Sequence, residues 1–317
     1  MNIYNLQKLN KVIKSDFVKN SILLLFHIFN RRYLSIYLDP NLACNLRCRS
    51  CYFSNDEKRS ELNGSFRQED LIPMAKAIFD RTLRLQIGCG AEPTLFKYNP
   101  ELIQLAKKHG IRYISLTTNA NLLNKESIKN LLESGLDELT ISLHGVNQNT
   151  YEHLMTNASY TKLIEVLRIL SNEKLQYPHF KLRLNYTVNN LNVNELSTFF
   201  DVFGTFSIDI LQLRTLRDIG GDIRLISLTE SFNQSLKESL YSLKTQCEKR
   251  AIVFIPPDDL KKEDLTSNSN TIKSFAYGYI SPKVFLQPDF NWQNETFNQY
   301  SKRANYSFKL FKDLFTK

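Results

Sequence analysis

The sequence predicts an α/β fold: a partial (β/α)6, TIM-like barrel followed by a small α+β extension. Two patterns along the chain and one of its bulk properties predict it. Short runs rich in apolar and β-branched residues recur between residues 33 and 213, and amphipathic segments with helical spacing separate them. A chain of 317 residues, 42% of them hydrophobic, can bury the core of one such barrel and its extension.

Six segments are predicted to be strands, and five to be the helices that connect them. In residues 161–174, for example, Leu163, Val166, Leu167 and Leu170 recur at the spacing that places them on one helix face. Parallel strands bring their carboxyl ends to one rim, where the functional residues of barrels gather. The predicted strands are 33–38, 84–88, 113–118, 138–143, 181–188 and 208–213, and the predicted helices are 68–81, 100–109, 125–134, 161–174 and 193–206.

The chain is predicted to divide into three parts. Residues 1–32 are predicted to be a basic amphipathic helical segment, 33–220 the barrel and 221–317 the extension. The extension is predicted to contain a helix at 228–243, a strand at 251–255, a polar loop at 263–270, a hairpin at 275–292 and a final helix at 298–315.

Three cysteines follow the first predicted strand. Cys44, Cys48 and Cys51 have the spacing C-x3-C-x2-C, and their neighbours are asparagine, arginine and serine, as is typical of a loop. Three thiolates can hold three irons of a four-iron cluster and leave the fourth iron open. The loop therefore predicts a metal-cluster site at the barrel rim.

Other interpretations of these cysteines fit less well. A structural zinc site usually has four ligands in paired elements, and no second pair of cysteines or histidines completes one here. Five cysteines are too few, and odd in number, for a disulfide framework. Three buried thiols that are close by chance are the remaining alternative, because unmodified cysteine is often buried.

The cysteine loop, down to the aromatic Tyr52 after its last cysteine, resembles the cluster loop of radical S-adenosylmethionine (SAM) enzymes. The resemblance covers residues 33–220 and is closest to the SPASM/twitch maturase-like branch. It implies a 4Fe-4S cluster held by Cys44, Cys48 and Cys51, with SAM bound to the open iron through its amino and carboxylate groups.

The ends of the later strands carry further parts of the resemblance. The run Gly88-Cys-Gly-Ala-Glu-Pro93 is similar to the Gly-Gly-Glu-Pro motif that receives the SAM amine, with Ala91 where a second glycine is usual. Gly90 allows close backbone approach, and Glu92 is expected to accept a hydrogen bond from an ammonium group. The resemblance implies SAM contacts from Tyr52, Gly90, Ala91, Glu92, Asn119, Ser142 and Asn185.

Two rim residues are candidates for catalysis, and the catalytic residues are otherwise unknown. His144 stands where aspartate is more usual and could meet the substrate or act in proton transfer. Arg214 could hold a carboxylate with two hydrogen bonds. The plainer alternatives are a solvated or hydrogen-bonded histidine and a surface ion pair.

The resemblance implies an enzyme that cleaves SAM reductively to a 5'-deoxyadenosyl radical, which abstracts hydrogen from a substrate. It also implies an electron donor such as flavodoxin or ferredoxin. The favoured substrate is a peptide in ribosomal-peptide maturation; a sugar, nucleotide or lipid-linked small molecule is the alternative, as is a degenerate iron–sulfur protein without turnover. Cys89 and Cys247 are predicted to be ordinary thiols, so the extension lacks ligands for an auxiliary cluster.

The formal net charge of +9 comes entirely from residues 1–32 and 301–317. Basic residues there alternate with apolar ones, as in a helix that lies on an anionic membrane surface or a partner; a solvated helix face is the alternative.

No signal peptide is evident, the apolar run 22–29 is too short to span a bilayer, and no nucleic acid is expected as a partner. The expected location is the cytoplasm, with membrane contact through the N-terminus, whose apolar residues are Val12, Phe17, Ile22, Leu23, Leu25 and Phe26.

Overall fold

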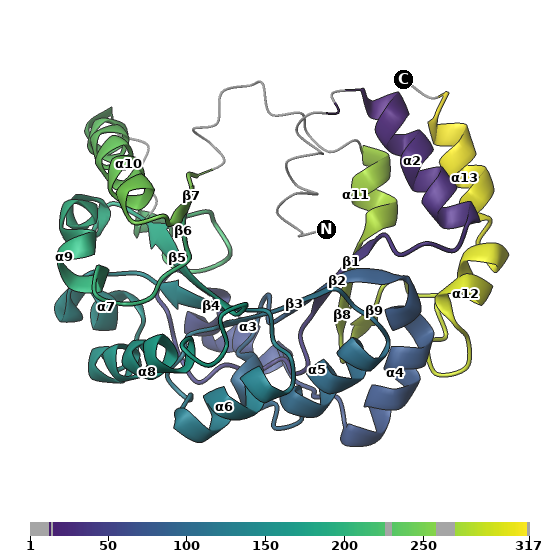
Figure 1. The fold of residues 1–317 in the computed structure, drawn as a ribbon, viewed down its shortest axis with the longest axis horizontal. Helices are drawn as coiled ribbons and strands as arrows, with labels where there is room; N and C mark the ends of the chain where they lie inside the picture. Colours follow the sequence, from purple (N-terminus) through teal and green to yellow (C-terminus); the bar gives the residue numbers. More distant parts are fainter. Residues whose placement is uncertain (1–12, 14, 226–229, 258–269, 316–317) are drawn as a thin grey trace.

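One open, mainly parallel sheet organises the molecule. In the computed structural model, the described part of the chain is residue 13 and residues 15–225, 230–257 and 270–315. The sheet forms an arc, with helices along its outer face and the two ends of the arc standing apart (Figure 1). This arrangement confirms the predicted fold class, a barrel that does not close.

The six predicted strands are all present and neighbouring strands pair in parallel. The bounds of β3 to β5 are those predicted, while β1, β2 and β6 differ by one or two residues at their ends. The strands are β1 (Leu34–Leu38), β2 (Thr82–Ile87), β3 (Tyr113–Thr118), β4 (Glu138–Leu143), β5 (Lys181–Val188) and β6 (Ile210–Thr215).

Three further strands come from residues beyond 220 and extend both edges of the sheet, in the order β7-β6-β5-β4-β3-β2-β1-β8-β9. The short strand β7 (Val253–Ile255) pairs with β6, and β8 (Tyr277–Ser281) pairs in parallel with β1. The antiparallel pair of β8 with β9 (Val284–Phe285) confirms the predicted hairpin. The sequence did not predict that this hairpin joins the barrel sheet.

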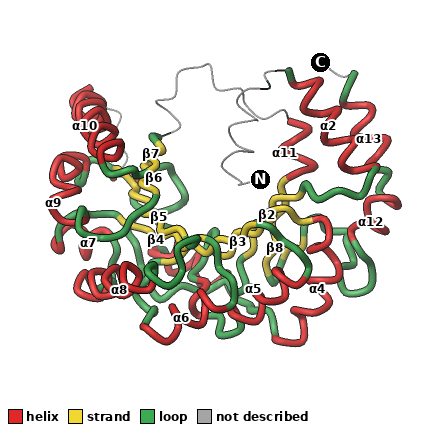
Figure 2. Tube along the Cα trace, viewed as in Figure 1, coloured by secondary structure: helices red, strands yellow, loops and turns green. Residues whose placement is uncertain are grey.

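Helices cover the outer face of the sheet (Figure 2). They are α4 (Leu71–Ile78), α5 (Asn99–Lys108), α6 (Lys125–Glu133), α7 (Gln148–Leu154), α8 (Tyr160–Glu173) and α9 (Phe199–Phe203). Predicted helix 193–206 was too long, because Val193–Thr198 is a 3-10 helix that precedes α9. Helices α3 (Asp56–Glu61) and α7 were not predicted; both are short and lie in the loops at the strand ends.

The strands alternate between an apolar outer face and a polar inner face. In β5, Leu182, Leu184, Tyr186 and Val188 are fully buried, whereas Arg183, Asn185 and Thr187 line a cavity inside the arc. Successive side chains of a strand point to opposite faces of the sheet, so one run of sequence supplies both the core and the site.

The remaining helices lie at the two ends of the arc. They are α10 (Glu230–Lys249) at one end and α2 (Asp16–Ile28), α11 (Asn270–Ala276), α12 (Phe297–Arg303) and α13 (Tyr306–Asp313) at the other (Figure 1). The single helix predicted at 298–315 was wrong: the chain breaks at Asn305, whose φ of 54° is left-handed and cannot continue a helix. Residues 263–269 of the predicted polar loop, and residues 1–12, lie outside the described part.

Buried His27 makes the stability of this fold depend on pH. Its Nδ1 is 3.0 Å from the Tyr33 hydroxyl, and burial, helped by the charge of Arg81, lowers its pKa to about 4. Between about pH 6.5 and 4 the unfolded chain therefore binds a proton that the native chain does not. We expect the midpoint of urea unfolding to fall as the pH falls through this window, and to fall less in H27Q. The exposed-histidine variant H179Q is the control, and an equal slope in H27Q and wild type would contradict the assignment.

Candidate active site

The three cysteines of the sequence motif open onto one cavity. The cavity has a volume of about 280 Å³, and Cys44, Cys48 and Cys51 line it together with Gly88 and the residues that follow β2. It lies at the carboxyl ends of the strands, on the inner side of the sheet. The prediction that strand ends bring these segments together is borne out by the geometry.

Hydrogen bonds from several directions hold the cysteine loop. The Arg47 guanidinium donates to the carbonyls of Cys44 (2.8 Å) and Leu46 (2.7 Å). The Arg47 amide donates to the carbonyl of Thr156, just beyond α7, and the Arg49 amide donates to the carbonyl of Leu154, the last residue of α7. Arg49 also forms an ion pair of 2.8 Å with Asp222. The cysteine loop is thus held in place by residues that are distant from it in the sequence.

The thiols have the chemistry expected of cluster ligands. Burial raises the pKa of Cys44 to about 11 and raises the pKa of Cys48 and Cys51 as well, so thiolates here need a nearby positive charge. The Leu46 amide donates to Cys44 Sγ at 3.4 Å, a contact that stabilises an anionic sulfur. Within the described residues, no three histidine, cysteine or acidic side chains surround a single ion. Three thiols that line one cavity are a donor set in which each sulfur could bind a separate iron of a cluster.

The turn after β2 requires glycine. Gly88 has a φ of 80°, and a Cβ there would lie 2.5 Å from the Thr117 carbonyl oxygen. At Gly90 a Cβ would lie 2.7 Å from the Tyr52 hydroxyl oxygen, which donates to the Gly90 carbonyl. Tyr52 thus supports the turn through this hydrogen bond. It is not one of the residues that line the cavity, and its role as a SAM contact stays a prediction.

Asp39 positions the same turn, and the sequence reasoning missed it. Its buried carboxylate accepts hydrogen bonds from the amides of Cys89 (2.7 Å) and Gly90 (3.0 Å) and from the Tyr279 hydroxyl (2.8 Å). The sequence signal that could have identified Asp39 is its position as an acidic residue directly after the first strand. The contribution of Tyr279 had no local signal, because β8 lies 240 residues further along the chain.

Glu92 is almost fully buried and its carboxylate is already bonded. Oε1 accepts from the Thr94 amide (3.0 Å), the Thr94 hydroxyl (2.6 Å) and the Thr118 hydroxyl (2.7 Å), and Oε2 accepts from the Asn119 amide (2.8 Å). Burial raises its pKa, whereas these hydrogen bonds lower it. Glu92 therefore ties the ends of β2 and β3 together, and Oε2 is the oxygen with room for another donor.

Ser142 and Asn185 lie side by side on β4 and β5 and line the cavity. Asn185 Oδ1 is buried and has no hydrogen-bond partner, an arrangement that costs free energy until a ligand donates to it. Asn119 also lines the cavity and donates to the Asn45 side chain in the cysteine loop at 2.9 Å. These residues and the glycine turn fit a polar ligand such as SAM.

The two catalytic candidates also face the cavity. Burial lowers the pKa of His144 to about 4, so its imidazole is neutral near pH 7 and can donate or accept a hydrogen bond. Arg214 lies two strands further on, near the end of β6. Their catalytic roles stay predictions.

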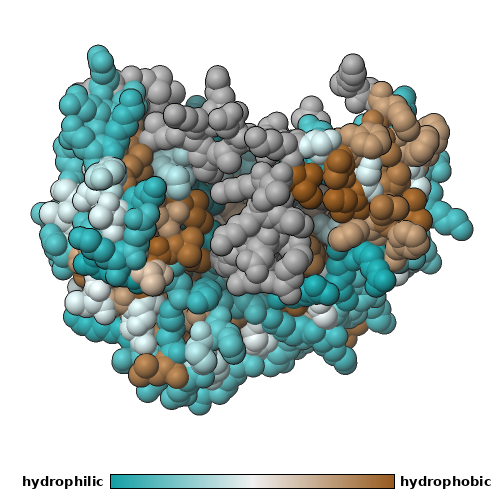
Figure 3. Space-filling view, turned by 45° about the horizontal axis from the view of Figure 1, so that its top comes forward, coloured by the Kyte–Doolittle hydropathy of each residue, from teal (hydrophilic) through white to brown (hydrophobic). Residues whose placement is uncertain are grey.

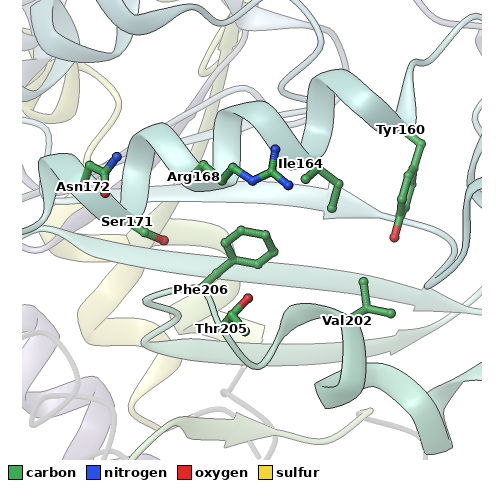
Figure 4. A pocket seen from close by; sticks show the side chains of 8 residues that line it. All are labelled: Tyr160, Ile164, Arg168, Ser171, Asn172, Val202, Thr205 and Phe206. Carbon is green, nitrogen blue, oxygen red and sulfur yellow. The ribbon is translucent and has the colours of Figure 1, made fainter.

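A second, larger cavity has none of these features. Its volume is about 620 Å³, and it lies between α8 and the segment around α9, on the outer face of the sheet (Figure 4). The residues that line it are Tyr160, Ile164, Arg168, Ser171, Asn172, Val202, Thr205 and Phe206. None of them was predicted as a site residue.

Two alanines in the loops at the strand ends, Ala91 after β2 and Ala120 after β3, differ in their backbones. Ala120 has a left-handed φ of 66°, whereas Ala91 is not among the residues with positive φ. Left-handed backbone costs a non-glycine residue about 1–2 kcal/mol. We expect A120G to be about 1 kcal/mol more stable than A91G in urea unfolding, because only A120G relieves this strain while both lose a methyl group. Equal stability of the two variants would show that Ala120 is not strained.

Comparisons with known proteins agree with this geometry. Residues 40–189 match the model of the radical SAM superfamily. A probable GTP 3',8-cyclase from Sulfolobus acidocaldarius is 27% identical over 193 residues, which cover 61% of this chain and 59% of that protein. The chain thus spans about three-fifths of the length of the curated relatives it matches.

Solved structures show the same fold. Streptococcus suis SuiB bound to its precursor peptide SuiA has a TM-score of 0.62 at 17% identity, covering 88% of this chain and 64% of that one. Native anSMEcpe with bound AdoMet and a peptide has a TM-score of 0.55 at 21% identity, covering 70% and 63%. At these identities the likeness is one of fold. Over residues 40–189, this chain is thus similar to the radical SAM superfamily, and its fold and its three-cysteine cavity agree with that similarity.

Proposed function

We propose that this protein is an enzyme that cleaves SAM reductively and uses the resulting radical to abstract hydrogen from a substrate. The observation that carries the proposal is the shared cavity: the three cysteines, the glycine turn, Ser142 and Asn185 all face one space. A reduced 4Fe-4S cluster held by Cys44, Cys48 and Cys51 would supply one electron, and bound SAM would supply the sulfonium that accepts it, with cleavage of its C5'–S bond to methionine and the 5'-deoxyadenosyl radical. A flavodoxin or ferredoxin is the proposed electron donor.

The role of this chain's own residues would be to bind and orient the cluster and SAM. Cys44, Cys48 and Cys51 would hold the cluster. The backbone of Gly90 and Ala91, fixed by Asp39, would meet the SAM amino acid group. Asn185 Oδ1, which has no partner in the protein, would accept a hydrogen bond from SAM.

A peptide is the first candidate substrate. SuiB and anSMEcpe, whose folds this chain shares, have been captured with peptides. Unlike a protein with an auxiliary cluster in its extension, this chain has one cysteine after the barrel, Cys247, and that residue is fully buried. A peptide substrate would therefore have to bind without iron ligands from the extension.

A nucleotide is the second candidate, and two observations favour it. The curated relatives are named as probable GTP 3',8-cyclases. The cavity is also lined by three arginines, Arg84, Arg183 and Arg214, and Arg84 Nε is buried with no partner. Arg183 forms an ion pair of 2.9 Å with Glu138, so Arg84 is the better candidate for contact with a phosphate.

The central test is anaerobic reconstitution with iron and sulfide, followed by reduction with SAM and chromatographic assay of 5'-deoxyadenosine. We expect wild type to form 5'-deoxyadenosine, and C48A to form none and to lose visible cluster absorbance. C247A is the matched control, because Cys247 is a cysteine outside the motif that does not line the cavity, and it should keep both properties.

An intact cluster that binds SAM and forms no 5'-deoxyadenosine under good reduction would favour the degenerate iron–sulfur protein instead. In that case A91G would be equally inert, whereas in an active enzyme A91G is expected to keep or improve turnover. A colourless reconstituted protein that holds zinc would contradict both.

The nucleotide candidate is tested by equilibrium dialysis of GTP with the reconstituted, SAM-bound protein. We expect R84Q to weaken GTP binding by about tenfold, since a charge-assisted hydrogen bond contributes about 1.5–3 kcal/mol. Arg112, which is exposed, supplies the control R112Q. No binding of GTP by the wild type at about 1 mM, which corresponds to roughly −4 kcal/mol, would leave the peptide as the candidate.

A further inference from the structure

Helix α2 has its apolar side turned outward. Lys19, Asn20 and His27 are buried, whereas seven apolar residues of the helix and its C-cap are exposed. A surface helix normally shows the opposite distribution. At 100° per residue, the exposed residues fall on one half of the helix and Lys19, Leu23 and His27 on the other. The exposed residues are Phe17, Val18, Ile22, Leu25, Phe26, Ile28 and Phe29.

Helix α13 continues this surface. It packs against α2 and buries Tyr306 and Leu310, while Phe308 and Phe311 lie on its exposed side and Phe315, in the turn just after it, is also exposed. The ten apolar residues of the two helices are each 37–69% exposed. We call them the α2/α13 face, and apolar surface gathers over these helices in Figure 3.

Single exposed apolar residues are normal on a protein surface, but a contiguous set of ten is typical of a surface that another molecule covers. The charges around the face indicate which kind of molecule covers it. Arg31, Lys302, Lys309 and Lys312 are exposed near it, and Asp16 is the exposed acid of α2. A cationic border around an apolar face complements an anionic lipid surface.

A second copy of the chain is a poorer fit. Arg31, Lys302, Lys309 and Lys312 are exposed basic residues, so two such faces would bring like charges together. No described helix is long and apolar enough to cross a membrane, so contact would be in the plane of the interface. Helix α2, with 13 residues or about 20 Å of length, can lie flat with its apolar half in the acyl boundary.

We propose that the α2/α13 face binds the surface of an anionic lipid membrane. The proposal goes beyond the proposed function and does not depend on it. It also corrects the surface expected from the sequence: Leu23 is buried, Val12 lies outside the described part, and α13 contributes three phenylalanines that were not expected.

The test is sedimentation of the full-length chain with vesicles of phosphatidylcholine alone, or of phosphatidylcholine with an equal amount of phosphatidylglycerol. We expect binding to the anionic vesicles that weakens with added salt. The double variants L25S/F29S and F308S/F311S should each lower the partition coefficient at least about tenfold, because each removes two large apolar side chains from the lipid. L175S, at an exposed leucine on another part of the molecule, is the control and should bind as wild type.

A second variant addresses charge without touching the apolar residues. K302E/K309E should lower binding to anionic vesicles and leave binding to neutral vesicles unchanged. Equal binding of wild type to both vesicle types, or full binding by the serine variants with unchanged thermal unfolding, would overturn the proposal. So would a wild-type dimer in light scattering that F308S/F311S converts to a monomer, since the face would then be an interface between copies.

Discussion

The site depends on one buried residue, Glu92, that joins three loops. Its carboxylate accepts four hydrogen bonds from the turn after β2 and the end of β3. Its amide donates to the Ala43 carbonyl, and its own carbonyl accepts from the Asn41 side chain, both in the segment that leads into the cysteine loop. A carboxylate buried this deeply is tolerated only with such a set of donors. The relative positions of the cysteines and the glycine turn are therefore set by bonds that meet at one residue.

The parts of the fold that sequence predicted well are those with local signals. Strands β3, β4 and β5 have the predicted bounds because alternating apolar residues mark each strand without reference to the rest of the chain. The break at Asn305 and the 3-10 helix at Val193–Thr198 escaped prediction, since the apolar spacing continues through both. The pairing of β8 with β1 depends on a contact between distant segments, for which spacing gives no information.

The same distinction holds for the site. The cysteines could be found because they form a spaced motif in the loop after β1, and Ser142 and Asn185 because they lie in recognisable strands; the structure brings all of them to one cavity. Asp39 was missed because its role depends on hydrogen bonds from two residues that are distant in the sequence, Gly90 and Tyr279. Arg84 and Arg183, unlike the predicted Arg214, were missed for a different reason: whether their side chains face the inside of the arc depends on strand register.

The hydrogen bond between Tyr279 and Asp39 has a consequence for biogenesis. During synthesis, all three cysteines and the glycine turn leave the ribosome well before Tyr279 does, so the turn first forms without one of the partners that fixes Asp39. Tyr279 belongs to β8, which pairs with the open side of β1, so until β8 is made the early chain presents an unpaired edge there. Maturation with iron and sulfur would then be most efficient once β8 has been made and has paired with β1.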